Sequence, residues 1–181
     1  IVLTDDVRHK YTFLQSRYAF KVCRIEPENN IHLILDVFSE YKKLNIVIIG
    51  NWLNSEYGRN LKTIYCNFKN IFLLDPIYDQ SILNQLRSNC YIYIHGHSAG
   101  GTNPSLVEAM YLGLPIIAYG VSYNKETTKD KALYFNNKKD LLYIIENLND
   151  NQLNIIANDM YKIAQENYTW DKIAKTYSQL F

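Results

Sequence analysis

Short apolar runs alternate with amphipathic stretches along most of the chain. The apolar runs are rich in Ile, Val, Leu and Tyr, which predicts buried β-strands. The stretches between them carry apolar residues at helical spacing, as Ile31, Ile34 and Phe38 do in the first of them. We predict strands at 18–24, 45–49, 71–74, 90–95, 115–119 and 132–135. We predict helices at 30–42, 55–67, 80–88, 104–111, 139–147, 151–167 and 170–180, with a helical turn near Lys125.

The regular alternation of strands and helices predicts the fold class. Strands joined through helices pair in parallel, and their crossovers are right-handed. The runs at 46–49 and 91–94 are apolar on both faces, as a sheet covered by helices on both sides requires. We therefore expect an α/β, Rossmann-like, doubly wound and mainly parallel six-stranded sheet with closing C-terminal helices. Such sheets bind ligands beyond the carboxyl ends of their strands.

Composition narrows the class of protein further. The chain has 181 residues, a net charge of +1, 48% hydrophobic residues and 20% charged residues, as a globular domain has. The near-neutral charge argues against a nucleic-acid partner, and no apolar run reaches the roughly 20 residues that span a bilayer. The cysteines form no CxxC pair and predict buried thiols in a reducing compartment. Because the first residue is Ile1, we expect a fragment of a longer protein.

The loop after the fourth predicted strand carries the strongest chemical signal. It reads His-Gly-His-Ser-Ala-Gly-Gly-Thr-Asn-Pro-Ser-Leu-Val-Glu over residues 95–108. The pair Gly100-Gly101 lets backbone N–H groups approach a ligand, and Asn103 and Pro104 suit the start of a helix. Such a helix start attracts phosphate, and Glu108 one turn later could accept hydrogen bonds from ribose hydroxyls. The bland alternatives are a simple turn at the glycines and a capping box between Ser105 and Glu108.

Arg24 ends the first predicted strand, so its side chain should lie at the same edge of the sheet. A guanidinium there can direct its paired N–H donors at a diphosphate. The alternative is a surface ion pair with Glu26 or Glu28. The sequence leaves both interpretations open.

Two segments together resemble a known family. Residues 24–29 (Arg-Ile-Glu-Pro-Glu-Asn) and 101–110 (Gly-Thr-Asn-Pro-Ser-Leu-Val-Glu-Ala-Met) resemble the carboxy-terminal, donor-binding domain of family 4 glycosyltransferases. Those enzymes have the GT-B architecture of two Rossmann-like domains across a cleft. The His-Gly-His segment and the later stretch 119–128 are most similar to the bacterial rhamnosyltransferase-like branch.

The resemblance implies roles for individual residues. Arg24 would contact the donor diphosphate, and Glu108 would hold the ribose hydroxyls. Ile77 and Tyr78 would lie where the family presents backbone groups to a pyrimidine. His97 would bind the phosphates or the sugar. The implied phosphate-binding loop consists of Gly100, Gly101, Thr102, Asn103, Pro104 and Ser105.

Two departures from the general family pattern bear on the donor. Gly100 stands where a Glu usually meets the sugar hydroxyls, and Asn29 stands where a Lys usually neutralises phosphate. Lys125 or a protonated His97 would compensate for the lost charge. A 6-deoxy sugar such as rhamnose is compatible with the change at Gly100, because a different hydroxyl pattern needs different partners.

His95 and His97 invite a metal interpretation, since His-x-His can supply two ligands. No further ligand lies nearby in the sequence, and the resembling family needs no metal for the diphosphate. We therefore expect no metal and no cofactor, with a dTDP- or UDP-linked sugar as substrate.

The resemblance also implies an activity and a setting. The intact protein would be a retaining transferase that delivers a sugar to a polysaccharide or lipid-linked acceptor in capsule or O-antigen synthesis. It would work in the cytoplasm, in peripheral contact with the inner face of the bacterial membrane. Residues 1–17 would be a linker and entry helix and residues 18–181 the nucleotide-sugar-binding domain. The N-terminal acceptor domain would lie outside this chain, leaving the fragment alone inactive. The alternatives are the nucleotide-binding subunit of a split transferase and half of a nucleotide-sugar epimerase.

Overall fold

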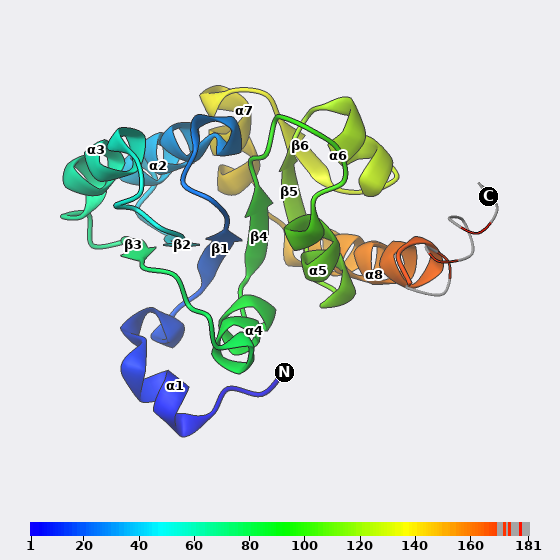
Figure 1. Ribbon diagram of the computed structural model, residues 1–181, viewed down its shortest axis with the longest axis horizontal. Helices are drawn as coiled ribbons and strands as arrows, with labels where there is room; N and C mark the ends of the chain where they lie inside the picture. The colour runs from blue at the N-terminus through cyan, green and yellow to red at the C-terminus, as the bar shows by residue number, and fades with distance from the viewer. Residues whose placement is uncertain (170–171, 173, 175–177, 179–181) are drawn as a thin grey trace.

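A computed structural model describes residues 1–169, 172, 174 and 178 of the chain. Its centre is a six-stranded sheet in which every neighbouring pair is parallel, in the order β3-β2-β1-β4-β5-β6 (Figure 1). The predicted fold class is confirmed. The strands are β1 (Tyr18–Val22), β2 (Asn45–Ile49), β3 (Ile71–Leu74), β4 (Ile92–His95), β5 (Ile116–Tyr119) and β6 (Leu133–Phe135).

Helices connect the strands and cover both faces of the sheet. They are α1 (Asp5–Lys10), α2 (Ile31–Glu40), α3 (Glu56–Tyr65), α4 (Gln80–Ser88), α5 (Pro104–Tyr111), α6 (Ser122–Thr127), α7 (Lys138–Glu146) and α8 (Asp150–Asn167). Two short 3₁₀ helices, η1 (Thr12–Gln15) and η2 (Pro27–Asn29), flank β1.

Several predicted boundaries need correction. β1 stops at Val22 and not at 24, because the chain turns there into the Pro27 segment. β4 starts at Ile92 and not at 90, because the Cys90 N–H still donates to the Arg87 carbonyl in the turn after α4. The turn expected near Lys125 is a six-residue helix. The helix predicted at 170–180 lies largely outside the described residues.

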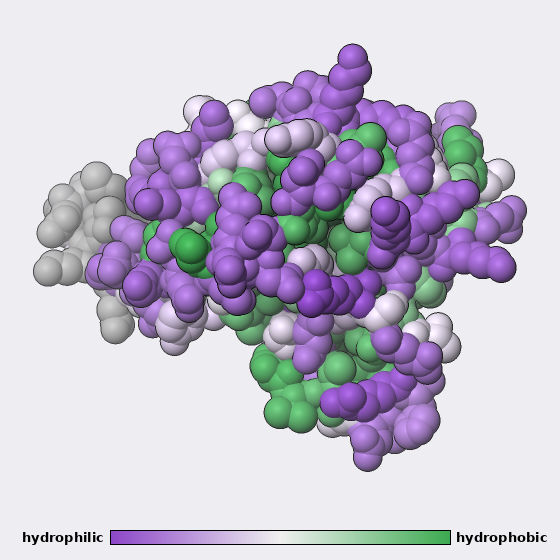
Figure 2. Space-filling model, turned by 180° about the vertical axis from the view of Figure 1, so that it is seen from behind, coloured by the Kyte–Doolittle hydropathy of each residue, from purple (hydrophilic) through white to green (hydrophobic). Residues whose placement is uncertain are grey.

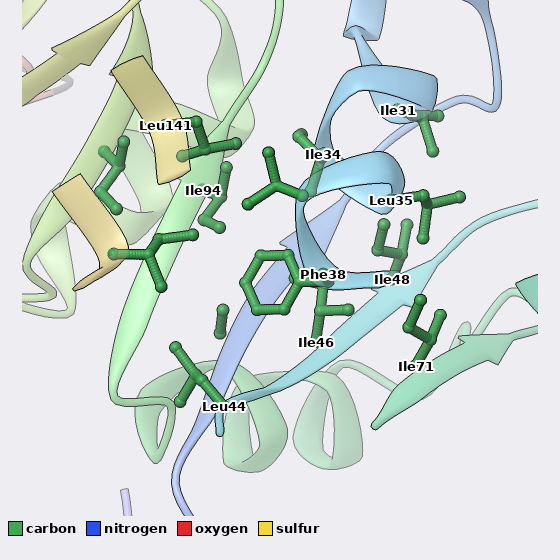
Figure 3. Packing of buried hydrophobic residues seen from close by; sticks show 14 of the residues in the cluster. Ile31, Ile34, Leu35, Phe38, Leu44, Ile46, Ile48, Ile71, Ile94 and Leu141 are labelled. Carbon is green, nitrogen blue, oxygen red and sulfur yellow. The ribbon is translucent and has the colours of Figure 1, made fainter. Parts of the chain in front are cut away.

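The sheet buries a different apolar layer on each face because side chains alternate along every strand. On one face, Ile46 and Ile48 of β2 pack under α2, α3 and α7. On the other, Val47 and Ile49 pack with residues of α1, α4, α5 and α8. Figure 3 shows the first layer, where Phe38 of α2 points toward the sheet beside Ile46. Fully burying one such side chain contributes about 1.5–3 kcal/mol.

The surface is mostly hydrophilic on the side that Figure 2 displays, with apolar residues gathered at its lower end. That end carries the N-terminal segment in Figure 1, where Ile1 and Val2 are exposed. No helix within the described residues is both long and apolar enough to cross a bilayer. The expectation of buried thiols is wrong for Cys66, which is exposed at the end of α3.

Candidate functional site

Two adjoining hollows lie beyond the carboxyl end of β1 and share Val22, Cys23 and Arg24. The first, of about 370 Å³, lies between the end of β1, helix α4 and the start of α5; its other lining residues are Asn29, Gln80, Leu83, Arg87, His97, Asn103, Pro104, Ser105 and Glu108. The second, of about 320 Å³, is bordered by the segments that follow β1, β2 and β3, including Ile77 and Tyr78. We call them the α5 hollow and the β3 hollow. Both lie at the sheet edge where ligands of doubly wound folds bind.

The start of α5 forms one wall of the α5 hollow. The Asn103 side-chain oxygen accepts hydrogen bonds from the Ser105 N–H (3.0 Å) and the Ser105 hydroxyl (2.8 Å), with Pro104 as the first helical residue. The N-cap expected at Asn103 is confirmed. The helix therefore begins at the hollow with its positive dipole end, which favours an anion there.

The glycines before α5 keep the approach to that helix start open. Gly100 has a φ of +97°, a conformation that side-chain-bearing residues rarely adopt. A Cβ added at Gly101 would meet no atom within 4 Å. Thr102 faces away toward α6, where its hydroxyl lies 3.3 Å from that of Thr127. Gly100, Gly101 and Thr102 thus shape the loop without lining the hollow.

Glu108 does not cap its own helix, so the capping-box interpretation is wrong. Its Oε2 accepts a hydrogen bond from the Arg87 guanidinium, which the end of α4 supplies. The Arg87 side chain is only 4% exposed, whereas that of Glu108 is 55% exposed. Glu108 thus stands at the hollow with a buried cation behind it.

Sequence reasoning missed Arg87. It is a single arginine near the end of an amphipathic helix, and its partner is 21 residues further along the chain. No local pattern links the two residues. The sequence offered one signal. Arg87 follows Leu86 on the side of the helix that is buried, where an arginine needs an acidic partner.

Arg24 lines both hollows, and its side chain is 75% exposed. Its guanidinium lies 3.3 Å from a Glu26 carboxylate oxygen, which is the surface pairing that the sequence left open. Exposed pairs of this kind contribute about 0–1 kcal/mol. The contact is weak enough for Arg24 to exchange it for a diphosphate.

Asn29 has a structural role where the family pattern has a Lys. It is 4% exposed, and its side-chain amide donates to the Arg24 carbonyl at 2.9 Å. Its oxygen lies 3.3 Å from Nδ1 of His97. Burial, first, and the nearby Lys21 charge, second, lower the pKa of His97 below its usual value. This environment disfavours the protonated His97 that would compensate for the charge missing at Asn29.

Three further predicted residues lie apart from the α5 hollow. Lys125 sits on α6 with its ammonium 5.5 Å from the centre of the Tyr134 ring, and it lines neither hollow. Tyr78 borders the β3 hollow but is 85% exposed, whereas Ile77 beside it is half-buried.

His95 and His97 lie near each other without a third His, Cys, Asp or Glu ligand among the described residues. Their rings are 6.1 Å apart and tilted by 60°, and His95 is 2% exposed. Burial, first, and the Lys21 charge, second, lower the pKa of His95 well below its usual value. Within the described residues, no group of three His, Cys, Asp or Glu side chains is placed to hold a metal ion.

The family described as glycosyl transferases group 1 matches residues 5–167. An uncharacterized glycosyltransferase of Methanocaldococcus jannaschii is 26% identical over 164 residues, which are 85% of this chain and 41% of that protein. The chain therefore spans less than half the length of this curated relative.

Two solved structures share the fold at low identity. The C-terminal domain of a glycosyl transferase group 1 family protein from Francisella tularensis has a TM-score of 0.71 and 14% identity, covering 92% of this chain and 95% of that one. An Anabaena protein crystallised with UDP and glucose has a TM-score of 0.79 and 16% identity, covering 98% and 53%. The family match over most of the chain shows that it belongs to the glycosyl transferases of group 1.

Proposed function

We propose that this chain is the donor-binding domain of a GT-B glycosyltransferase and that the α5 hollow binds the diphosphate of a nucleotide sugar. One observation carries the proposal: Arg24, which follows β1, borders the same hollow as the start of α5 and Glu108 of that helix, although the two segments are far apart in the sequence. A guanidinium and a helix start attract phosphate, and a carboxylate one turn later suits ribose hydroxyls. The Anabaena neighbour with UDP and glucose supports this choice of ligand class.

The chemistry of sugar transfer explains these groups. As the bond between sugar and diphosphate breaks, negative charge grows on the leaving diphosphate. Arg24 and the N–H groups at the start of α5 stabilise that charge from fixed positions, and removing one such donor typically costs about 10²–10³ in rate. Transfer proceeds with retention, and the leaving phosphate oxygen takes the acceptor proton.

The adjoining β3 hollow is the place for the base. Ile77 offers a half-buried apolar wall, and Tyr78 is exposed and able to cover a ring. A pyrimidine, as in UDP or dTDP, fits this space. Gly100 leaves no carboxylate for the sugar hydroxyls at that position, which agrees with a 6-deoxy sugar such as rhamnose.

The acceptor belongs to a second domain. This chain spans 41% of its curated relative and 53% of the Anabaena protein, so a further domain of similar size is expected in the whole enzyme. That domain would bring a saccharide or lipid-linked acceptor of capsule or O-antigen synthesis at the inner face of a bacterial membrane. The isolated chain then binds nucleotide and transfers no sugar.

Titration calorimetry of the chain with UDP, dTDP and GDP tests the proposal. We expect heat with at least one of these and tighter binding of the diphosphate than of the matching nucleoside. Absence of heat with all three at millimolar concentration would contradict nucleotide binding. Sugar turnover by this chain alone would contradict the need for a second domain.

A further inference from the structure

We propose that Arg87 is a positioning residue for ribose recognition: it holds the carboxylate of Glu108 in the orientation that accepts the ribose hydroxyls. The inference rests on the proposed function and adds a residue on α4 to it. Its basis is the unequal burial of one ion pair at the α5 hollow, 4% for Arg87 and 55% for Glu108.

The Arg87–Glu108 pair leaves one carboxylate oxygen of Glu108 free for a ligand in the α5 hollow. Arg87 donates to Oε2 of Glu108, while Oε1 accepts no hydrogen bond from the residues that the structure describes. One oxygen is thus fixed from behind and the other is left for a ligand. A carboxylate ordered in this way can accept a ribose hydroxyl on Oε1 at a smaller cost in side-chain entropy.

The burial of Arg87 argues against a purely stabilising contact. A buried guanidinium is costly, and an ion pair whose carboxylate is 55% exposed recovers little of that cost. The Nε of Arg87 is also buried without a partner among the described residues. A buried polar atom without a partner needs an explanation, and the orientation of Glu108 supplies one.

The backbone N–H groups at the start of α5 could in principle hold the Glu108 side chain instead. In this helix the capping role belongs to Asn103. Asn103 caps α5, so no backbone donor of the first turn holds the Glu108 side chain. Arg87 is therefore the residue that orders it. Ordering one flexible side chain in advance is worth roughly 2- to 12-fold in affinity.

The test compares two nucleotides that differ only in the hydroxyls of the ribose, with inorganic pyrophosphate as a ligand that has no ribose. The nucleoside diphosphate that binds best is titrated beside its 2′,3′-dideoxy form and beside inorganic pyrophosphate. In the wild-type chain the hydroxylated form should bind more tightly than the dideoxy form. The variant Arg87→Met should reduce that ratio roughly 2- to 12-fold, beyond any loss of affinity that it shares with pyrophosphate through the removed charge.

Two further variants keep the test decisive. Arg87→Lys retains a buried cation with a single ammonium, so its ratio should lie between those of the wild type and Arg87→Met; it replaces the Met variant if that one does not fold. Glu108→Gln should lower the ratio as well, and adding Arg87→Met to it should lower the ratio no further. Arg17→Met is the matched control, because it removes an arginine from a carboxylate pair with Asp150 outside the hollow.

The outcomes separate the two proposals. Failure of every nucleotide to bind the wild type overturns the proposed function. Nucleotide binding with a ratio that Arg87→Met and Arg87→Lys both leave unchanged overturns the role of Arg87. A uniform loss for all three ligands also overturns it, because that result indicates a general distortion of the hollow.

Discussion

The Asn124 side chain holds the loop of His97 in place. Its amide donates to the His97 carbonyl at 2.9 Å and to the Tyr119 carbonyl at 2.9 Å, and Asn124 is 1% exposed. The start of α6 is thereby joined to the ends of β4 and β5. The loop that leads into α5 starts from this fixed point.

Replacing Asn124 should therefore destabilise the domain. Asn124→Ala leaves two carbonyls without their donor, at a cost of about 1–3 kcal/mol. Urea unfolding followed by fluorescence measures the change. Asn154→Ala on the exposed side of α8 is the control and should change stability by no more than about 0.5 kcal/mol. Equal midpoints for the two variants would show that the Asn124 contacts contribute nothing.

Variants of Arg24 and Glu108 should separate the contributions of the diphosphate and of the ribose to nucleotide affinity. Arg24→Ala should weaken diphosphates by roughly 10- to 100-fold and the nucleoside far less, because a charged hydrogen bond to phosphate is lost. Glu108→Ala should weaken both, because both contain ribose. Calorimetry with UDP and uridine makes the comparison, with Arg59→Ala on α3 as an exposed control. A uniform effect of Arg24→Ala on both ligands would contradict its contact with phosphate.

Gly96 and Gly101 should respond differently to the same substitution. A Cβ at Gly96 would lie 2.3 Å from the Asn29 carbonyl oxygen, so Gly96→Ala forces backbone to move and should cost about 1–3 kcal/mol. Gly101→Ala meets open space and should leave stability nearly unchanged. Thermal unfolding of both variants gives the answer, and a wild-type Tm for Gly96→Ala would rule out the close approach.

The buried His95 should make the domain sensitive to acid. Burial lowers the pKa of His95 in the folded protein well below its usual value. Below about pH 6.5, His95 is therefore protonated in the unfolded chain but stays neutral in the folded one. Stability should therefore fall as pH falls, by up to about 1.4 kcal/mol per pH unit for this group. His95→Gln should flatten the curve of unfolding free energy between pH 7.5 and 5.5. His97 acts in the same direction, so part of the slope should remain, and parallel curves would contradict the assignment.

Several parts of this protein followed from the sequence alone. The apolar runs at 45–49 and 71–74 became strands with the expected ends, and the helices at 80–88 and 104–111 began and ended as predicted. Residues close by in the sequence determine these boundaries. Asp79 and Asn103 are the N-caps of the two helices, and the spacing of apolar residues changes between strand and helix. The parallel sheet followed because strands joined by helices have few other ways to bury both faces.

The tertiary structure decided which side chains meet. Arg87 and Glu108 pair across two helices, and Asn29, expected as a lost charge, supports the Arg24 carbonyl. Lys125 was expected near the phosphates and lies over Tyr134. Hydrophobic period and caps depend on neighbours along the chain, whereas ion pairs and pKa shifts depend on distances between segments far apart in sequence. Those distances exist only once the helices have packed on the sheet.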